Sequence, residues 1–242
     1  MKKIFIKYLK IIFLLLVGLN TNAQKQFVVD PDAVVREIAG SFSSIKVSSG
    51  IHVFLSYADT EALAVSASEE QYRNGIKTEI TNGELHIFYM GDKIRYNNNF
   101  RMNVYVGYKN LEQLFASGAS NITIAGLMEL SLLNVQLSGA SQLKGQLKIG
   151  NLNIKLSGAS EAKISGNVEN INIESSGASD VKAFGLIGDN CNVKASGASD
   201  VNITVNKNMA ANASGASNIF YKGSAELTLK QSSGASKVAR IN

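Results

Sequence analysis

The sequence holds few of the residues that usually build catalytic or metal sites. Its 242 residues include two histidines, His52 and His86, and one cysteine, Cys191. A zinc site with three histidine ligands is therefore excluded, and a single cysteine allows no disulfide bond within the chain. These scarcities favour a protein that carries no metal or cofactor.

Proline and helical patterning are also scarce. The only proline is Pro31, and in the second half of the chain apolar residues do not recur at helical spacing. Apolar and polar residues instead alternate with a period of two, as in residues 152–156 and 171–175. This alternation predicts strands with one buried side.

What the chain has in abundance is one tetrapeptide, Ser-Gly-Ala-Ser. It occurs seven times, at intervals of 18 to 21 residues, beginning at Ser117, Ser138, Ser157, Ser176, Ser196, Ser214 and Ser233. One unit of about 19 residues, with two or three short strands, cannot bury an apolar side alone, but stacked units can. The repeat therefore predicts an all-β fold, a right-handed parallel β-helix (β-solenoid). An antiparallel sandwich, the alternative, would not use the same loop seven times.

The tetrapeptide is interpreted as a corner of each coil. Its glycine can adopt positive φ, its alanine is small enough to lie inside the corner, and its serines can hydrogen-bond to the turn backbone or to each other. Asparagines at one repeat position predict a second ladder: Asn134, Asn153, Asn172 and Asn192. Both ladders are interpreted as stabilising the coils, with a dedicated binding surface as the alternative. Seven identical serines without a nearby histidine do not indicate a nucleophile.

The first 23 residues have the pattern of a secretory signal peptide. Four lysines precede an apolar stretch over residues 11–19, and small residues offer a cleavage site near Ala23. We expect export to the periplasm, the outer surface or the medium of a Gram-negative-type bacterium. The formal net charge of +5 falls to +1 without this segment. A nearly neutral chain gives no electrostatic reason to bind nucleic acid or an anionic membrane.

Residues 24–110 form a second kind of β-rich region. Strand-like stretches occur at residues 45–55, 63–67, 76–80, 85–89 and 102–106, and Asn82-Gly83 is typical of a hairpin turn. Residues 45–55 surround a Ser-Ser-Gly corner and look like a degenerate copy of the later units. We expect this region to be continuous with the helix of residues 111–242 and to cap one end of it.

Together these features resemble the bacterial auto-transporter adhesin, head GIN domain, family. The resemblance rests on the export signal, residues 45–55, the Asn82-Gly83 hairpin and the repeated Ser-Gly-Ala-Ser corners. It implies an exported β-helical protein with an adhesion role, and it supplies no motif residues for a site. Since only residues 237–242 follow the last motif, we expect no C-terminal translocation barrel.

Two repeat positions bear on chemistry. Cys191 occupies the position of Leu133, Leu152, Ile171 and Met209 and is predicted to be buried. The position after each motif places Glu161, Asp180 and Asp200 in one column about 5 Å apart. That spacing suits a calcium site or a glycosidase carboxylate pair. The alternative is a surface neutralised by the column of Lys144, Lys163 and Lys182.

The leading functional hypothesis is an exported, non-enzymatic binding or adhesion module directed at a glycan or a cell surface. The alternatives are a carbohydrate-active or calcium-dependent protein that uses Glu161, Asp180 and Asp200, and a purely architectural envelope protein. At the last coil, an extra residue in strand 227–232 predicts a bulge. The bulge and the charges of Lys230, Lys237 and Arg240 predict a monomer or a weak homodimer.

Overall fold

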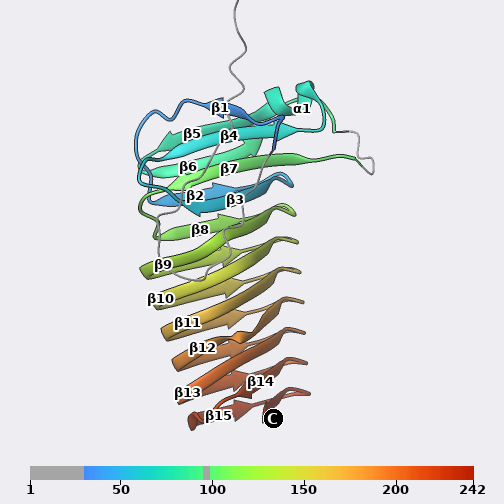
Figure 1. Cartoon of the computed structure of the whole chain (residues 1–242). Coiled ribbons are helices and arrows are strands. Elements are labelled where there is room, and N and C mark those ends of the chain that lie inside the picture. The colour runs from blue at the N-terminus through green and yellow to red at the C-terminus, as the bar shows by residue number, and fades with distance from the viewer. Residues whose placement is uncertain (1–29, 95–98) are drawn as a thin grey trace, which may run out of the picture.

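The computed structural model describes residues 30–94 and 99–242, and the predicted signal peptide lies outside these residues. The described chain forms one tapering column of stacked strands, with a broader β-region at one end (Figure 1). The predicted all-β parallel β-helix is confirmed. The coils are built from strands β9 (Asn121–Leu137), β10 (Gln142–Leu156), β11 (Glu161–Ser175), β12 (Asp180–Ala195), β13 (Asp200–Ala213), β14 (Asn218–Lys222), β15 (Glu226–Ser232) and β16 (Lys237–Arg240).

Consecutive coils pair in parallel with nearly constant register. Gln142 lies beside Glu161, and Glu161 lies beside Asp180, one coil apart at each step. The predicted interior column is also in register, and its members are buried: Leu133, Leu152, Ile171, Cys191 and Met209. The equal lengths of the units therefore bring identical positions into vertical columns.

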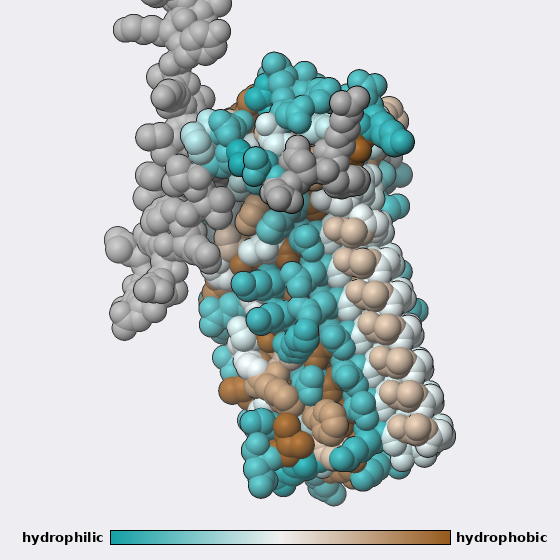
Figure 2. All heavy atoms as spheres, turned by 90° about the vertical axis from the view of Figure 1, so that its right-hand side faces the viewer, coloured by the Kyte–Doolittle hydropathy of each residue, from teal (hydrophilic) through white to brown (hydrophobic). Residues whose placement is uncertain are grey.

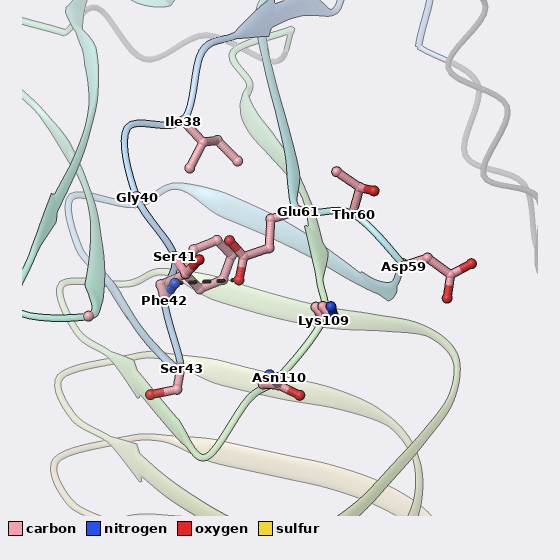
Figure 3. Close-up of a pocket in the computed structure, with 11 residues that line it drawn as sticks. Ile38, Gly40, Ser41, Phe42, Ser43, Asp59, Thr60, Glu61, Lys109 and Asn110 are labelled. Carbon is pink, nitrogen blue, oxygen red and sulfur yellow. Dashed lines mark hydrogen bonds between the residues drawn. The ribbon is translucent and has the colours of Figure 1, made fainter.

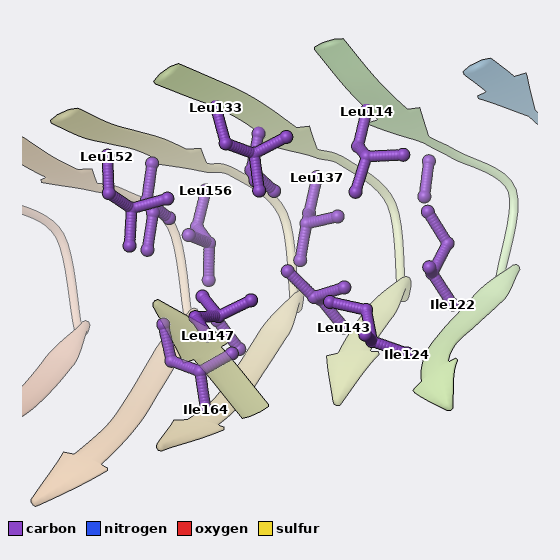
Figure 4. Close-up of a cluster of buried hydrophobic side chains, with 14 of the residues drawn as sticks. Leu114, Ile122, Ile124, Leu133, Leu137, Leu143, Leu147, Leu152, Leu156 and Ile164 are labelled. Carbon is purple, nitrogen blue, oxygen red and sulfur yellow. The ribbon is translucent and has the colours of Figure 1, made fainter. Parts of the chain in front are cut away.

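Each coil has three sides, because the inside–outside alternation breaks twice. In β10 the buried residues are Leu143 on the first side, Leu147 and Ile149 on the second, and Leu152, Ile154 and Leu156 on the third. The breaks fall at Gly145-Gln146 and Gly150-Asn151. Aliphatic side chains of successive coils point into one continuous interior (Figure 4). Burial of this apolar surface is the main force that holds the coils together.

The Ser-Gly-Ala-Ser corners stack directly on one another. Gly177 has φ +75°, and the Ala178 N–H donates to the Gly158 carbonyl of the previous coil at 2.7 Å. From the second motif to the sixth, the last serine is buried, and its hydroxyl donates to the first serine's carbonyl, as in Ser179 to Ser176 at 2.8 Å. The predicted serine bonds to turn backbone are therefore confirmed.

The expected position of the alanine is wrong. The alanines of all seven motifs are exposed, and they form a straight row along one edge of the column (Figure 2). The buried place inside the corner is taken by the last serine, because its hydroxyl can satisfy a turn carbonyl there. A methyl group would leave that carbonyl without this bond.

The capping region covers one end of the column with mixed pairing. It contains β1 (Val34–Arg36), β2 (Ser44–Val47), β3 (His52–Tyr57), β4 (Ala62–Ala67), β5 (Ile76–Thr81), β6 (Glu84–Tyr89), β7 (Met102–Tyr108) and β8 (Gln113–Ala116). Strands β2 and β3 pair in parallel with β8 and β9, so the Ser48-Ser49-Gly50 corner stacks above the first motif. Antiparallel strands β1, β4 and β5 lie beyond them. The cap and the repeat thus share one continuous sheet.

Two local features complete the comparison with the sequence. The predicted hairpin turn joins β5 and β6, with Asn82 and Gly83 at φ +51° and +76°. A short helix, α1 (Glu70–Gly75), was not predicted, because six residues are too few to show helical periodicity. Buried Tyr72 anchors it to the cap. Among the described residues, no helix has the length and apolarity needed to cross a membrane.

At the far end, the predicted bulge is present. The pairing of β15 with β13 shifts by one residue between Leu227 and Leu229, which leaves Thr228 as the extra residue. Within residues 30–94 and 99–242, no strand pairs with the outer edge of β15 or β16. The side chain of Leu229 is 46% exposed at this edge.

Candidate binding faces of the solenoid

The predicted acidic column lies on the first side of the coils. Glu161, Asp180 and Asp200 follow one another in register on β11, β12 and β13. All three are engaged by neighbours. Lys182 forms ion pairs with Glu161 and Asp180, Gln142 donates to Glu161 at 2.7 Å, and Asn218 donates to Asp200 at 2.8 Å.

These contacts determine the protonation of Glu161 in the acidic column. The hydrogen bond from Lys182 holds the pKa of Glu161 below its usual range, although partial burial acts in the opposite direction. A general acid needs the reverse, a carboxyl whose pKa is raised toward neutrality. Nowhere in the described part of the chain do three histidine, cysteine or acidic side chains gather closely enough to hold a metal ion. The calcium hypothesis thus gains no support from the geometry.

The third side of the coils carries a different surface, which we call the amide face. Its outward residues form three columns in register. The first column holds Asn151, Asn170, Asn190 and Asn208. The second column holds Gln113, Asn134, Asn153, Asn172 and Asn192. The third column holds Phe115, Gln136, Lys155, Glu174, Lys194 and Asn212. Most of these side chains are carboxamides, so the face offers many uncharged donors and acceptors.

Side-chain amides on this face are linked from coil to coil. In the second column, Asn153 donates to Asn134 at 2.8 Å and Asn172 donates to Asn153 at 2.9 Å. The predicted ladder is therefore confirmed over three coils, and no bond to Asn192 is present in the described structure. The bonds hold the amides in one orientation, which supports the prediction that the ladder stabilises the coils.

A second asparagine ladder was missed from the sequence. Asn170 donates to Asn151 at 3.0 Å, Asn190 to Asn170 at 3.1 Å, and Asn208 to Asn190 at 2.9 Å. Each of these residues lies two positions before the second column, so both sets point outward on the same side. Their spacing of 18 to 20 residues was the available signal. It was obscured because Asn151 follows Gly150 and Asn190 lies two residues after Gly188, in segments typical of turns.

A shallow groove of 270 Å³ runs across the amide face over β8, β9, β10 and β11. Its walls include half-buried Phe115, three ladder asparagines, and the ion pair of Lys155 with Glu174 at 3.6 Å. An aromatic ring beside fixed amides is a combination suited to ligands with both apolar and polar faces.

The cap carries a larger and more open pocket of 630 Å³. It is bounded by three loops, at residues 38–43, 59–61 and 109–110. At its centre the Glu61 carboxylate accepts a bond from the Phe42 N–H at 3.4 Å (Figure 3). Asp59, Thr60 and Lys109 at the rim are exposed. The pocket holds no repeated or converging set of functional groups.

Cys191 and His52 do not form a reactive site. Burial in the solenoid interior raises the pKa of the Cys191 thiol to about 12, so the thiolate is not formed near neutral pH. Desolvation lowers the pKa of His52, whose Nε2 lies 2.8 Å from the Thr123 hydroxyl. The His52 ring stacks on Phe54, which stacks in turn on Tyr105. The predicted burial of Cys191 is therefore confirmed.

Comparison with known proteins gives the fold and the family. No functionally curated protein matches this sequence. Among solved structures, a "putative adhesin" from Bacteroides fragilis is 18% identical, with a TM-score of 0.76, and the match covers 86% of this chain and 97% of that one. A "putative adhesin" from Parabacteroides merdae is 20% identical, with a TM-score of 0.64, and covers 87% and 97%. A "putative lipid binding protein" from Parabacteroides distasonis is 20% identical, with a TM-score of 0.63, and covers 87% and 97%.

At these identities, the structural likeness establishes the fold alone. The family is established by the sequence itself. The family model described as "Putative auto-transporter adhesin, head GIN domain" matches residues 41–225, which include most of the cap and six of the seven corners. The chain therefore belongs to the auto-transporter adhesin, head GIN domain, family.

Proposed function

We propose that the protein is an exported, non-enzymatic binding module that attaches to a glycan or another cell-surface component through its amide face. The observation that carries this proposal is the array of oriented carboxamides around the groove on β8, β9, β10 and β11. Membership in a family whose description names an adhesin also supports a binding role.

The amides of this face keep binding capacity. A carboxamide has two N–H donors and two oxygen lone pairs. Asn153 uses one N–H toward Asn134 and one lone pair toward Asn172. Within the described residues, its second N–H and second lone pair have no protein partner, so they are available to ligand hydroxyl groups. Because the ladder fixes the side chain, binding costs little conformational entropy.

A non-enzymatic role is supported by the state of the acidic column. Glu161 is paired with Lys182, which favours the ionised carboxylate and disfavours a proton-donating role. We also propose cleavage of a signal peptide near Ala23 and delivery to the periplasm, the outer surface or the medium, on the residue pattern of positions 1–23.

We further propose a monomer or a weak homodimer in solution. The outer edge of the last coil carries the bulge at Thr228 and the charged side chains of Lys237 and Arg240, devices that oppose edge-to-edge pairing.

A glycan array tests the binding function. The mature chain, without residues 1–23, is expected to bind at least one glycan class. Asn153→Ala with Asn172→Ala should weaken that binding, whereas Lys163→Ala on the first side should leave it unchanged. Failure to bind any glycan or intact bacterial surface would overturn the proposal. Binding that is insensitive to the double variant would remove the amide face from it.

A further inference from the structure

We infer that the amide face takes an uncharged polysaccharide, lying along the solenoid axis across several coils. This inference rests on the proposed function and specifies its ligand. The juxtaposition that carries it is the pair of asparagine ladders beside Phe115 and the groove that crosses from β8 to β11.

The chemistry of the face favours a ligand without charge. From β10 to β12, two of its three columns contain only carboxamides, and Leu132, Ala210 and Glu226 continue these columns in the flanking strands. In the third column, Lys155 and Glu174 neutralise each other at 3.6 Å, which leaves Lys194 as the remaining charge of that column between β8 and β13. An anionic polymer would meet Glu174 and gain little electrostatic attraction, whereas hydroxyl groups can both donate to and accept from amides. An uncharged, hydroxyl-rich chain is therefore the best chemical match.

The repeat of the amides determines the direction in which a polymer would lie on the face. Equivalent amides recur once per coil, about 4.8 Å apart along the axis, and neighbouring columns are about 7 Å apart along the strands. Both ladders run along the axis, and the groove has the same course. A polymer of pyranose rings laid along the axis presents a similar set of hydroxyls at each ring. It can therefore repeat the same contacts from one coil to the next.

Phe115 lies at the cap end of this track. It is partly exposed, it lines the groove, and it is in register with Gln136 of the next coil. The C–H groups on one side of a sugar ring can pack on such an aromatic ring while its hydroxyls face the amides. Phe115 thus supplies an apolar contact that a purely polar ladder lacks.

Repetition also predicts how affinity depends on ligand length. Each ring contributes weakly, and a longer chain adds contacts without a new association step. The Asn151-to-Asn208 ladder spans four coils. Affinity is therefore expected to rise with the number of rings up to about that span, and then to level off.

The test uses the mature chain in affinity electrophoresis. The uncharged probes are hydroxyethyl cellulose and galactomannan, and the anionic probes are polygalacturonate and heparin, each at low and high salt. We expect retardation by an uncharged polymer, unchanged by salt. Asn153→Ala with Asn172→Ala, and separately Phe115→Ala, should weaken it about tenfold. Lys163→Ala should not. Thermal melts of all variants check folding, and short and long oligosaccharides of the retarding polymer test the length dependence.

The outcomes separate this inference from the function on which it rests. Retardation by anionic polymers alone, loss of binding at high salt, or equal affinity for short and long oligosaccharides would overturn the inference. The binding function would then stand with a different ligand. If none of these polymers binds but the glycan array gives a charged ligand, only the inference falls. If neither experiment detects binding, both fall.

Discussion

Each coil depends on a glycine whose backbone no other residue adopts without strain. At Gly177, φ is +75°, and a Cβ atom built there would lie 2.5 Å from the Gly158 carbonyl oxygen of the previous coil. Gly83 in the cap hairpin has nearly the same φ, +76°, but nothing lies within 4 Å of its Cβ position. A substitution at Gly83 therefore tests backbone strain alone, whereas one at Gly177 tests backbone strain together with the packing of adjacent coils.

The first prediction compares alanine at these two glycines. Gly83→Ala should lower the free energy of unfolding by about 1 kcal/mol through strain alone. Gly177→Ala should lower it by about 3 kcal/mol or more, because the new methyl group also forces adjacent coils apart. Urea denaturation of both variants measures the difference. Equal losses would show that coil stacking does not constrain the corner.

The buried serines of the corners are not equivalent. Ser160 donates to the Ser157 carbonyl at 2.8 Å, whereas the Ser120 hydroxyl, which is fully buried, has no hydrogen-bond partner within the described residues. The cause lies in the turn. Gly118 and Ala119 both have positive φ in the first motif, as do Ser49 and Gly50 above it, but only the glycine does in later motifs.

The second prediction follows from this contrast. Ser160→Ala should lower the free energy of unfolding by about 1 kcal/mol, because it removes a satisfied buried bond. Ser120→Ala should leave stability unchanged or raise it by up to about 1 kcal/mol, because it removes an unsatisfied hydroxyl. A loss at Ser120 as large as that at Ser160 would contradict the prediction and would point to a bound water.

Asp30 ties the start of the described chain to the cap. Its carboxylate accepts bonds from Ser66 at 2.5 Å and Tyr105 at 2.6 Å. Burial would raise the pKa of Asp30, but these bonds, the Asp32 N–H and the charge of Arg101 outweigh it and hold the pKa below 3.8. Burial, and after it the hydrogen bond to Asp30 and the negative charge of Asp30, raise the pKa of Tyr105 to about 12.

The third prediction concerns acid stability. Because the pKa of Asp30 is lower in the folded chain, its contribution is complete above the unfolded value of 3.8 and is lost as the pH falls through the folded value. Asp30→Asn should therefore be less stable than the parent at neutral pH, and the difference should shrink below about pH 4. Melting temperatures across this range measure it. A difference that stays constant with pH would show that the charge is unimportant.

At the scale of strands, the sequence predicted the features that follow from the repeat of about 19 residues. It missed the features that depend on local backbone and side-chain geometry. The interior column through Cys191 follows from alternation and spacing alone, and the structure confirms it. The orientation of the motif alanine does not follow, because either a methyl or a hydroxyl group fits a corner by size. The bond from Ser179 to the Ser176 carbonyl decides it. The helix α1 was missed because six residues are too few to show helical periodicity, and the Asn151 ladder was missed because Asn151 and Asn190 lie in glycine-containing segments interpreted as turns.

The last strands give the fourth prediction. Lys237 and Arg240 lie on β16, whose outer edge has no paired strand in the described chain. Replacing both with valine should increase self-association in light scattering, since charge on an edge strand opposes pairing. Lys194→Val and Lys163→Val, within the sheet, provide the control and should have no effect. A double variant as monomeric as the parent would show that these charges do not protect the edge.

At the scale of the whole molecule, the family accounts for the architecture. The choice of ligand depends instead on the residues that point outward from the coils. The corner glycines and serines and the interior aliphatic residues recur from coil to coil. The outward columns differ between the sides of the coils, with ion pairs around Lys182 on the first side and amides around Asn153 on the third. The sequence placed the acids of the first side in one column and offered their neutralisation by a column of lysines, but it could not show which lysine pairs with which acid. That pairing depends on side-chain reach between coils.

The fifth prediction tests whether each coil acts as an independent stacking unit. Removing residues 157–175 deletes one coil of 19 residues and joins Leu156 to Ser176, which occupies the register position of Ser157. Nearest-neighbour stacking predicts that the shortened chain still folds cooperatively. Its unfolding enthalpy should be about 13 kcal/mol lower, in proportion to the residues lost. Removing residues 157–166 instead breaks the register and should abolish the transition. If both deletions unfold the chain, the coils are not the independent stacking units that the nearest-neighbour description assumes.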